Sequence, residues 1–310
     1  MEIHSGFESA CSVLSDRIRI AVMRIDRDEK ERITEIRLRL GRSLSVGFPE
    51  NDLFVTEEGK LTRYPGLGIK IDRNDIEAVF QSACRYSVHS FQKEVANGFL
   101  TIAGGNRIGI CGTAVVSCGK IENVRDISGL NIRIAREITG CAQELQTKLE
   151  SAGIQSVLIA GPPSSGKTTI LRDLCRIIGQ TERISVIDER NELSATFGGM
   201  PQYYTGAHSD VFCGYPKADG IITAIRVMSP KIIICDEIGT AEDVEALEKA
   251  LYTGVRIIAT VHAGSIEDAK RRKGISKLIK DGAFDATVLL GSGIKLGKIL
   301  RIQRSVEKSD

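Results

Sequence analysis

The segment IAGPPSSGKTTILRD contains a glycine-rich loop of the kind that holds phosphates. Its pattern, G-x-x-x-x-G-K-T, follows the apolar run SVLIA and precedes a helical pattern, which is the context that this motif requires. Backbone N–H groups of such a loop, together with the start of the helix, surround phosphate oxygens. We therefore expect ATP to bind here; the alternative is a loop that only turns the chain. The expected contacts are Gly161, Pro162, Pro163, Ser164, Ser165, Gly166, Lys167, Thr168 and Thr169.

The segment KIIICDEIG supplies a second element of the same chemistry. Its apolar run predicts a buried strand that ends at Asp236, where the carboxylate and the Thr168 hydroxyl are expected to ligate Mg²⁺. Glu237 follows directly and is expected to polarise the attacking water, while Lys167 reaches the β- and γ-phosphates. The alternative is that both carboxylates only cap the next helix.

Two further strand ends carry polar residues that we expect at the same edge of the sheet. The first, VIDERNE, holds Asp188, Glu189 and Glu192. These carboxylates are candidates for holding a metal-bound water or the nucleophile; the alternative is a solvated loop paired with Arg190. The second, IIATVHAGS, ends with Thr260 and His262, which are candidates for sensing the γ-phosphate. A structural histidine is the alternative there.

The spacing of these segments predicts a parallel α/β core. About 70 residues separate Lys167 from Asp236, which leaves room for an additional strand, RISVIDER, and favours hydrolysis over phosphorylation of a small molecule. Nearly continuous apolar runs are typical of strands that are buried on both faces of a parallel sheet. The runs are SVLIA, RISVID, KIIICD and RIIATVH, with helices expected at 167–179, 218–228 and 241–253, and two last strands at DATVLLG and KILRIQ.

The N-terminal part reads differently, as a mixed α+β region with antiparallel strands. Expected there are a helix over residues 1–24, a strand–turn–strand in ITEIRLRLGRSLSVGF, and a helix after Asp72. A hairpin with its turn at Gly104-Gly105-Asn106, a strand at 130–137 and a helix at 138–152 follow. We therefore predict an α+β domain over 1–145 and a RecA-like P-loop ATPase domain over 146–310.

Composition narrows the function classes. The chain has 310 residues, a net charge of +2 and no tryptophan, so neither a strong positive field nor base stacking favours a nucleic-acid partner. Its eight cysteines include no C-x-x-C pair, which favours a reducing cytoplasm over a disulfide framework. The start MEIHSGFESACSVL lacks the basic and apolar regions of a signal peptide, and no apolar run approaches a membrane span. Any membrane association is expected to be peripheral.

Several longer segments carry a resemblance to a known family. They are NGFLTIAGGNRIGICGTAVV, DISGLNIRIAREITGCA, GPPSSGKTTILRDLCR, VIDERNEL, GYPKADGIITAIRVMSPKIIICDEIGTAEDVEAL and ATVHAGSIEDA. Together they resemble the stage III sporulation protein AA family, which is similar in turn to the traffic ATPases of type II and type IV secretion systems. The loop PPSSGK departs from the family pattern, in which a glycine follows the prolines, but it keeps both required glycines and Lys167.

The resemblance implies more than the motifs do. It implies an ATPase that works as a homo-hexamer, in the cytoplasm of the mother cell, held at the membrane by a membrane-anchored sporulation or secretion-channel protein. By the same resemblance Glu237 is the catalytic acidic residue and His262 belongs to a histidine box. The acidic box corresponds to Asp188, Glu189 and Glu192. Arginines of a neighbouring subunit or of the N-terminal domain would complete the site. The candidates are Arg133, Arg136, Arg190 and Arg226.

Three functions remain open from the sequence. The first is an ATP-hydrolysing mechanoenzyme that energises assembly of, or transport through, a channel between mother cell and forespore. The second is a nucleic-acid-binding P-loop ATPase or translocase, suggested by the basic segments KRRKGISKLIK and RIRIAVMRIDR. The third is a scaffold that binds ATP without hydrolysing it.

Overall fold

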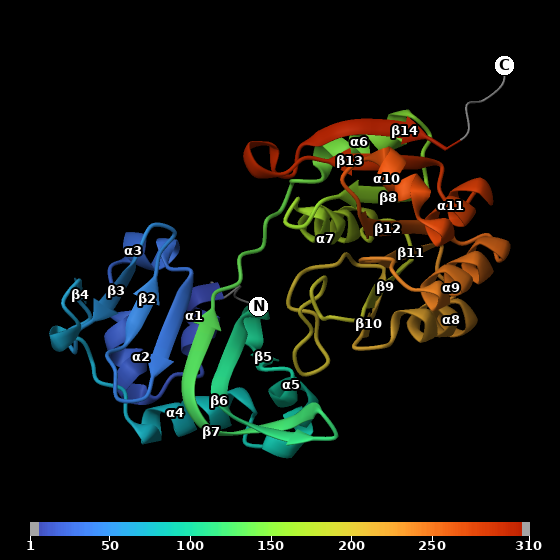
Figure 1. Ribbon diagram of the computed structural model, residues 1–310. Helices are drawn as coiled ribbons and strands as arrows, with labels where there is room; N and C mark the ends of the chain where they lie inside the picture. Colours follow the sequence, from blue (N-terminus) through green and yellow to red (C-terminus); the bar gives the residue numbers. More distant parts are fainter. Residues whose placement is uncertain (1–5, 306–310) are drawn as a thin grey trace. The chain divides into compact units, whose positions relative to one another are not determined.

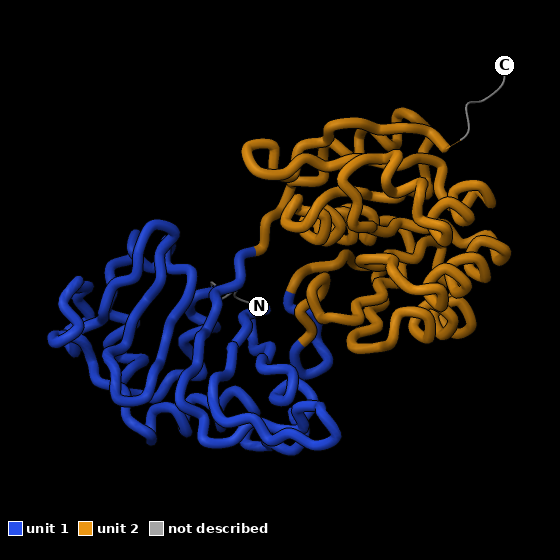
Figure 2. Tube along the Cα trace, in the orientation of Figure 1, with its two compact units in different colours: residues 1–136, 197–202 blue, residues 137–196, 203–310 orange. Residues whose placement is uncertain are grey.

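The chain forms two compact units in the computed structural model, which describes residues 6–305 (Figure 2). Unit 1 holds the chain up to Arg136 together with the short segment Phe197–Gln202. Unit 2 holds Glu137–Thr196 and the chain from Tyr203 onward. The chain therefore passes between the units three times.

Unit 1 is built on a seven-stranded antiparallel sheet in the order β4-β3-β2-β1-β7-β6-β5 (Figure 1). Its strands are β1 (Glu35–Arg39), β2 (Ser45–Gly47), β3 (Asp52–Val55), β4 (Leu61–Thr62), β5 (Phe99–Thr101), β6 (Arg107–Ser117) and β7 (Lys120–Arg133). Its helices are α1 (Gly6–Cys11), α2 (Asp16–Met23), α3 (Arg27–Arg32), α4 (Arg73–Ala83) and α5 (Gln92–Ala96), with 3₁₀ turns η1 (Pro65–Leu67), η2 (Val88–Phe91) and η3 (Ala103–Gly105).

The alternating pattern of ITEIRLRL explains how this sheet buries one face. In β1, Ile36 and Leu38 are fully buried in the core of the unit, whereas Glu35, Arg37 and Arg39 between them are half-buried on the opposite face. Such alternation is expected when only one face of an antiparallel sheet carries helices. The strand–turn–strand prediction for this segment is confirmed.

Other predictions for unit 1 are confirmed in part. Helix α4 begins after Asp72, whose side chain accepts from the Asp75 N–H at 2.9 Å in a capping box. The hairpin with its turn at 104–106 is present. The strand expected at 130–137 instead runs over Lys120–Arg133.

The single helix expected over residues 1–24 is wrong within the described residues; residues 1–5 lie outside them. Two helices, α1 and α2, are separated at Ser12–Ser15. Ser15 has ψ 149° and its hydroxyl donates to Asp75 at 2.9 Å, so this residue precedes a new helix instead of continuing the first. Val13 and Leu14 in the break are nevertheless buried, which is why the apolar spacing looked continuous.

Unit 2 is a seven-stranded sheet in the order β10-β9-β11-β12-β8-β13-β14, parallel except for β14 (Figure 1). Its strands are β8 (Val157–Gly161), β9 (Ile184–Asp188), β10 (Ser209–Cys213), β11 (Ile232–Cys235), β12 (Arg256–His262), β13 (Ala286–Leu290) and β14 (Ile299–Arg304). Its helices are α6 (Gln143–Ser151), α7 (Lys167–Ile178), α8 (Lys217–Met228), α9 (Ala241–Tyr252), α10 (Ile266–Arg271) and α11 (Lys273–Lys280), with a 3₁₀ turn η4 (Gly293–Lys295).

The continuous apolar runs of unit 2 serve two cores, one on each face of the sheet. In β8, Val157 and Ile159 belong to a cluster with α6 and α7, whereas Leu158 and Ala160 belong to a second cluster with α8, α9 and α11. Alternate residues of a strand point to opposite faces, so a strand covered on both sides must be apolar throughout. The parallel core and its three expected helices are confirmed. Strand β10 was not expected, and α6 begins at Gln143 rather than at 138.

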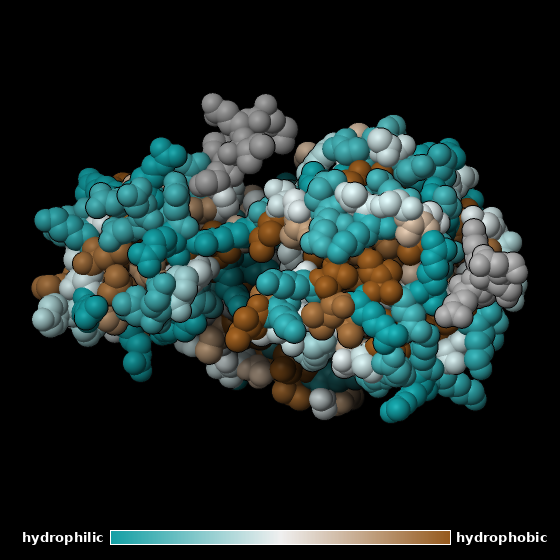
Figure 3. All heavy atoms as spheres, turned by 90° about the horizontal axis from the view of Figure 1, so that it is seen from above, coloured by the Kyte–Doolittle hydropathy of each residue, from teal (hydrophilic) through white to brown (hydrophobic). Residues whose placement is uncertain are grey.

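No helix among residues 6–305 is long and apolar enough to cross a membrane. Hydrophilic side chains cover most of the face seen in Figure 3, and apolar side chains lie in patches between them.

Candidate active site

The loop after β8 has the backbone geometry that its two glycines allow. Gly166 precedes α7 with φ +86°, in the left-handed region that favours glycine. A Cβ on Gly161 would collide with the Ser165 hydroxyl. The N–H of Gly297, in the β13–β14 turn, donates to the Ser165 carbonyl at 3.2 Å and supports the loop from the other side.

Lys167 is buried at the first position of α7, and its ammonium group lies inside the loop. It donates to the carbonyl oxygens of Gly161 and Pro162, both at 2.9 Å, and lies 3.2 Å from Nδ1 of His262. Burial lowers the pKa of Lys167 below its ordinary value, while the carboxylates of Asp236 and Glu237 act to raise it. A cation is thus held where a phosphate chain would be bound.

Asp236 directly follows β11 and accepts hydrogen bonds from two hydroxyl groups. Thr168 donates to Oδ2 at 2.6 Å, and Thr260 of β12 donates to Oδ1. The parallel pairing of β11 with β12, and of β12 with β8, places the ends of the three strands at one edge. A carboxylate and a neighbouring threonine hydroxyl are oxygen ligands that Mg²⁺ accepts in P-loop proteins.

Glu237 has φ +47°, a left-handed conformation that costs energy for a residue with a side chain. Its backbone is held on both sides: its N–H donates to Thr260 Oγ1 and its carbonyl accepts from Lys217 Nζ, each at 2.7 Å. Its carboxylate accepts from Arg190 at 2.8 Å and lies 3.2 Å from His262 Nε2. A strained backbone that is fixed by two hydrogen bonds, with two further contacts to the carboxylate, indicates a functional position.

His262 links Lys167 to Glu237 through its two ring nitrogens. An ammonium group can only donate, so Nδ1 must accept from Lys167 and the proton of a neutral ring must lie on Nε2, facing the Glu237 carboxylate. One imidazole ring thus bridges the ammonium group and the carboxylate.

A cavity of about 340 Å³ brings most of the predicted residues together. Its lining consists of Ser164, Ser165, Gly166, Lys167, Thr168, Thr169, Arg190, Glu192, Asp236, Glu237 and His262. Gly161 and Pro162 contribute carbonyl oxygens to Lys167 from outside this lining. The Ser165 hydroxyl is buried without a hydrogen-bond partner among the described residues, as expected of a loop built for a polar ligand. The donor set fits ATP with Mg²⁺.

The acidic segment after β9 divides into different roles. Asp188 is buried and accepts from the N–H groups of Glu192 at 2.8 Å and Ser194 at 2.8 Å, among others, so it organises its own loop. Glu189 lies 3.6 Å from Lys217. Neither residue lines the phosphate-loop cavity.

Lys217 was missed from the sequence. It is buried at the first position of α8, and its ammonium group contacts the Glu237 carbonyl, Glu189 and, at 3.7 Å, Asp243. The segment GYPKADG gives no sign of this role, because the three partners come from other parts of the chain. Only the unusual burial of a lysine identifies it.

The four candidate arginines differ in what they contact. Arg190 binds Glu237 within unit 2. Arg136 donates to backbone carbonyls of Glu31 and Ile33 within unit 1. Arg133 and Arg226 are exposed, and no ion pair of either is found in the described part of the chain. Arg136 is exposed as well, but its guanidinium is engaged with the carbonyl groups of Glu31 and Ile33.

The fold is shared with the solved structures of a pilus motor and of a bacterial ATPase. The pilus retraction motor PilT, solved with bound ADP, has a TM-score of 0.56 at 15% identity and covers 84% of this chain and 76% of its own. The ATPase DotB of Legionella pneumophila has a TM-score of 0.51 at 15% identity, over 84% of this chain and 73% of its own. At such identities the likeness shows the fold.

Sequence comparison identifies the family. The family described as sporulation stage III, protein AA, matches residues 7–308. Stage III sporulation protein AA of Bacillus subtilis is 32% identical over 296 residues, which are 94% of this chain and 92% of that protein. The chain belongs to this family, as the segments quoted above predicted.

Proposed function

We propose that this protein hydrolyses ATP with Mg²⁺. The observation that carries the proposal is the arrangement at the end of β11, where Asp236 binds the Thr168 hydroxyl of the phosphate loop and Glu237 is held directly beside it. Lys167, the loop N–H groups and the Ser165 hydroxyl would bind the phosphates. Mg²⁺, when bound by Thr168 and Asp236, supplies positive charge against the phosphate oxygens.

Glu237 would take the proton of the attacking water. Its fixed backbone orients the carboxylate, and His262 keeps it within reach of Lys167, so the state of the phosphate site is sensed at the base. This supports hydrolysis over the non-hydrolysing scaffold, because a scaffold has no need of a strained glutamate beside the metal ligand.

A phosphate-release assay tests the proposal. We expect release that depends on Mg²⁺ and is lost in Lys167→Ala, whereas Lys148→Ala, an exposed lysine of α6, should behave as wild type. ATP binding without phosphate release at any protein concentration would contradict hydrolysis and favour the scaffold that binds ATP without hydrolysing it.

We further propose a homo-hexamer in which Arg133 of one subunit acts at the site of another. An arginine supplied in trans contributes roughly 10³–10⁵ in rate in P-loop enzymes. Specific activity should therefore rise with protein concentration. A Lys167→Ala subunit should partly rescue an Arg133→Ala subunit in mixed oligomers, whereas a monomer with full activity would contradict the assembly.

In the cell we propose a role in endospore formation, in the mother-cell cytoplasm, with attachment to the membrane through a membrane-anchored partner of a secretion channel. Support comes from family membership and from the fold shared with the pilus retraction motor PilT and the ATPase DotB. Cells that carry Lys167→Ala should grow normally and fail to complete sporulation after engulfment. Normal sporulation with the variant protein present would mean that the role in endospore formation does not require ATP turnover.

A further inference from the structure

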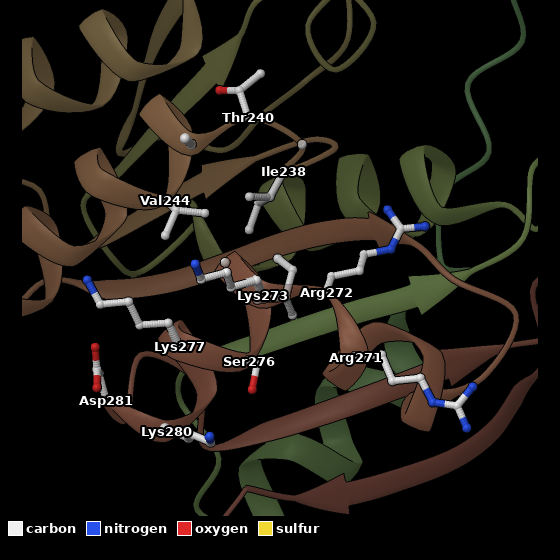
Figure 4. A pocket seen from close by; sticks show the side chains of 14 residues that line it. Ile238, Thr240, Val244, Arg271, Arg272, Lys273, Ser276, Lys277, Lys280 and Asp281 are labelled. Carbon is white, nitrogen blue, oxygen red and sulfur yellow. The ribbon is translucent and has the colours of Figure 1, made fainter.

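A second cavity of unit 2, about 860 Å³ in volume, lies between the start of α9 and helix α11 (Figure 4). We call it the basic groove. Its lining consists of Ile238, Gly239, Thr240, Ala241, Val244, Arg271, Arg272, Lys273, Gly274, Ile275, Ser276, Lys277, Lys280 and Asp281. The volume is in the range of specific binding sites, and the lining is separate from that of the phosphate-loop cavity.

The rim of the groove carries strong positive charge. Five of its side chains are basic and only Asp281 is acidic. Lys277 is neutralised by Glu248 at 2.7 Å, but the other four basic residues form no ion pair within residues 6–305. All five are exposed. A concave surface with unpaired charge of one sign concentrates ligands of the opposite sign.

The floor of the groove is apolar. Ile238 and Ile275 are almost fully buried beneath it, whereas half-buried Val244 and exposed Ala241, both of α9, present apolar atoms to the groove. Gly274 allows this close packing, because a Cβ at that position would lie 2.7 Å from Cγ2 of Val244. The groove therefore combines an apolar strip with a basic edge, and its occupant should carry apolar groups next to anionic ones.

We propose that the basic groove binds an acidic amphipathic segment of a partner protein. Nucleic acid fits less well, since no aromatic side chain lines the groove for base stacking. A membrane surface fits less well, since the apolar residues form a recessed floor instead of a protruding face. Carboxylates on a helix or strand with an apolar stripe match both parts of the surface.

Binding in the groove would act on the active site through the chain segment that connects the two linings. Ile238–Ala241 directly follow Glu237, and the Ile238 N–H donates to the Thr260 carbonyl at 2.9 Å. Thr260 also binds Asp236. A partner in the groove therefore contacts the segment that fixes the catalytic glutamate, and this regulatory consequence rests on the proposed ATPase function.

The test measures binding of a fluorescent synthetic peptide, helical with leucine on one face and glutamate on the other, by anisotropy without nucleotide. Lys273→Glu with Lys280→Glu should weaken binding on the order of tenfold or more, because two rim charges become repulsive. The matched control, Lys148→Glu with Lys249→Glu, makes the same change in net charge outside the groove and should change affinity by less than about twofold. Basal ATP turnover should be unchanged in both pairs, and any change in turnover caused by the peptide should be lost only in the first.

Several results would contradict the proposal that the basic groove binds an acidic amphipathic segment. Equal weakening by both pairs, or equal affinity for a polyglutamate peptide without leucine, would reduce the effect to net charge. Tighter binding of single-stranded DNA or of anionic phosphatidylserine vesicles, sensitive to the Lys273 and Lys280 changes, would assign the surface to those ligands. Peptide binding without any phosphate release would refute the proposed ATPase function and support the proposed peptide site. Phosphate release without peptide binding would support the ATPase function and refute the peptide site.

Discussion

Two neighbouring strands of unit 2, β9 and β11, both lead into an aspartate followed by a glutamate. The strands pair in parallel with Ile187 opposite Cys235, so Asp188 and Asp236 occupy adjacent positions at one edge of the sheet. Their surroundings differ. Asp188 accepts from backbone N–H groups and one serine hydroxyl, whereas Asp236 accepts from two threonine hydroxyls.

The type of donor decides what each carboxylate can do. Backbone N–H groups can only donate, so the charge of Asp188 is committed to the loop it closes. A hydroxyl can rotate and offer a lone pair, so Thr168 and Asp236 can turn from hydrogen-bond partners into joint ligands of a cation. The same dipeptide, Asp-Glu, thus supplies a structural carboxylate at the end of β9 and a candidate metal ligand at the end of β11.

The largest expected effect separates the two glutamates. Glu237→Gln should lower turnover by about 10²–10⁴ because an amide cannot accept the proton of water, and ATP binding should persist because Lys167, Thr168 and Asp236 remain. Glu189→Gln should lower turnover by less than about tenfold, since within residues 6–305 the one ion pair of its carboxylate is with Lys217 at 3.6 Å. Single-turnover and equilibrium-binding measurements check both. A larger loss at Glu189 than at Glu237 would reverse the assignment.

The aspartates should separate stability from metal affinity. Asp188→Asn should lower the free energy of unfolding by about 2–3 kcal/mol, since an amide NH₂ would face N–H donors in a buried loop. Asp236→Asn should leave stability nearly unchanged and weaken the Mg²⁺ dependence of nucleotide binding. Urea unfolding and a Mg²⁺ titration of ADP affinity distinguish them. Equal unfolding midpoints for both variants would contradict the difference in roles.

The sequence predicted the parts of this site that depend on local pattern. The phosphate loop, the end of β11 and His262 follow from a glycine spacing and from apolar runs that stop at a polar residue. It assigned Mg²⁺ to Asp236, but it left Asp188 as a candidate for holding a metal-bound water or the nucleophile. The structural role of Asp188 could not be predicted, because its hydrogen-bond donors take their positions only in the folded chain. Lys217 and Gly297 were not predicted for the same reason, since each contacts the site from a distant segment. The break between α1 and α2 escaped because buried Val13 and Leu14 preserve the apolar spacing across it.

Lys217 connects the two strand ends, so its removal should give an intermediate effect. Its ammonium group holds the Glu237 carbonyl at 2.7 Å and lies 3.6 Å from Glu189. Lys217→Met should lower kcat by about tenfold while the ATP Kd stays unchanged, because it releases the backbone of Glu237 and touches no phosphate ligand. Lys217→Arg, which keeps a cationic donor, should recover part of the rate. A change in Kd equal to the change in kcat would indicate general disruption instead of positioning.

The smallest expected effect is a change in the pH dependence of ADP binding. It tests the difference between Asp188 and Asp236 through electrostatics alone. Burial lowers the pKa of Lys167, and Asp236 and Glu237 oppose that shift, whereas Asp188 has no part in it. The protonated lysine binds phosphate, so ADP affinity without Mg²⁺ should fall as alkaline pH rises through this pKa, and it should fall earlier than for a lysine in water. Asp236→Asn removes a group that raises the pKa, so the fall should begin at lower pH. Asp188→Asn should leave the pH at which the affinity falls unchanged.

ADP titrations in the absence of Mg²⁺, from neutral to alkaline pH, measure the fall in affinity for both variants. If both variants moved the fall to lower pH by the same amount, the ends of β9 and β11 would share one electrostatic environment despite their different hydrogen-bond donors.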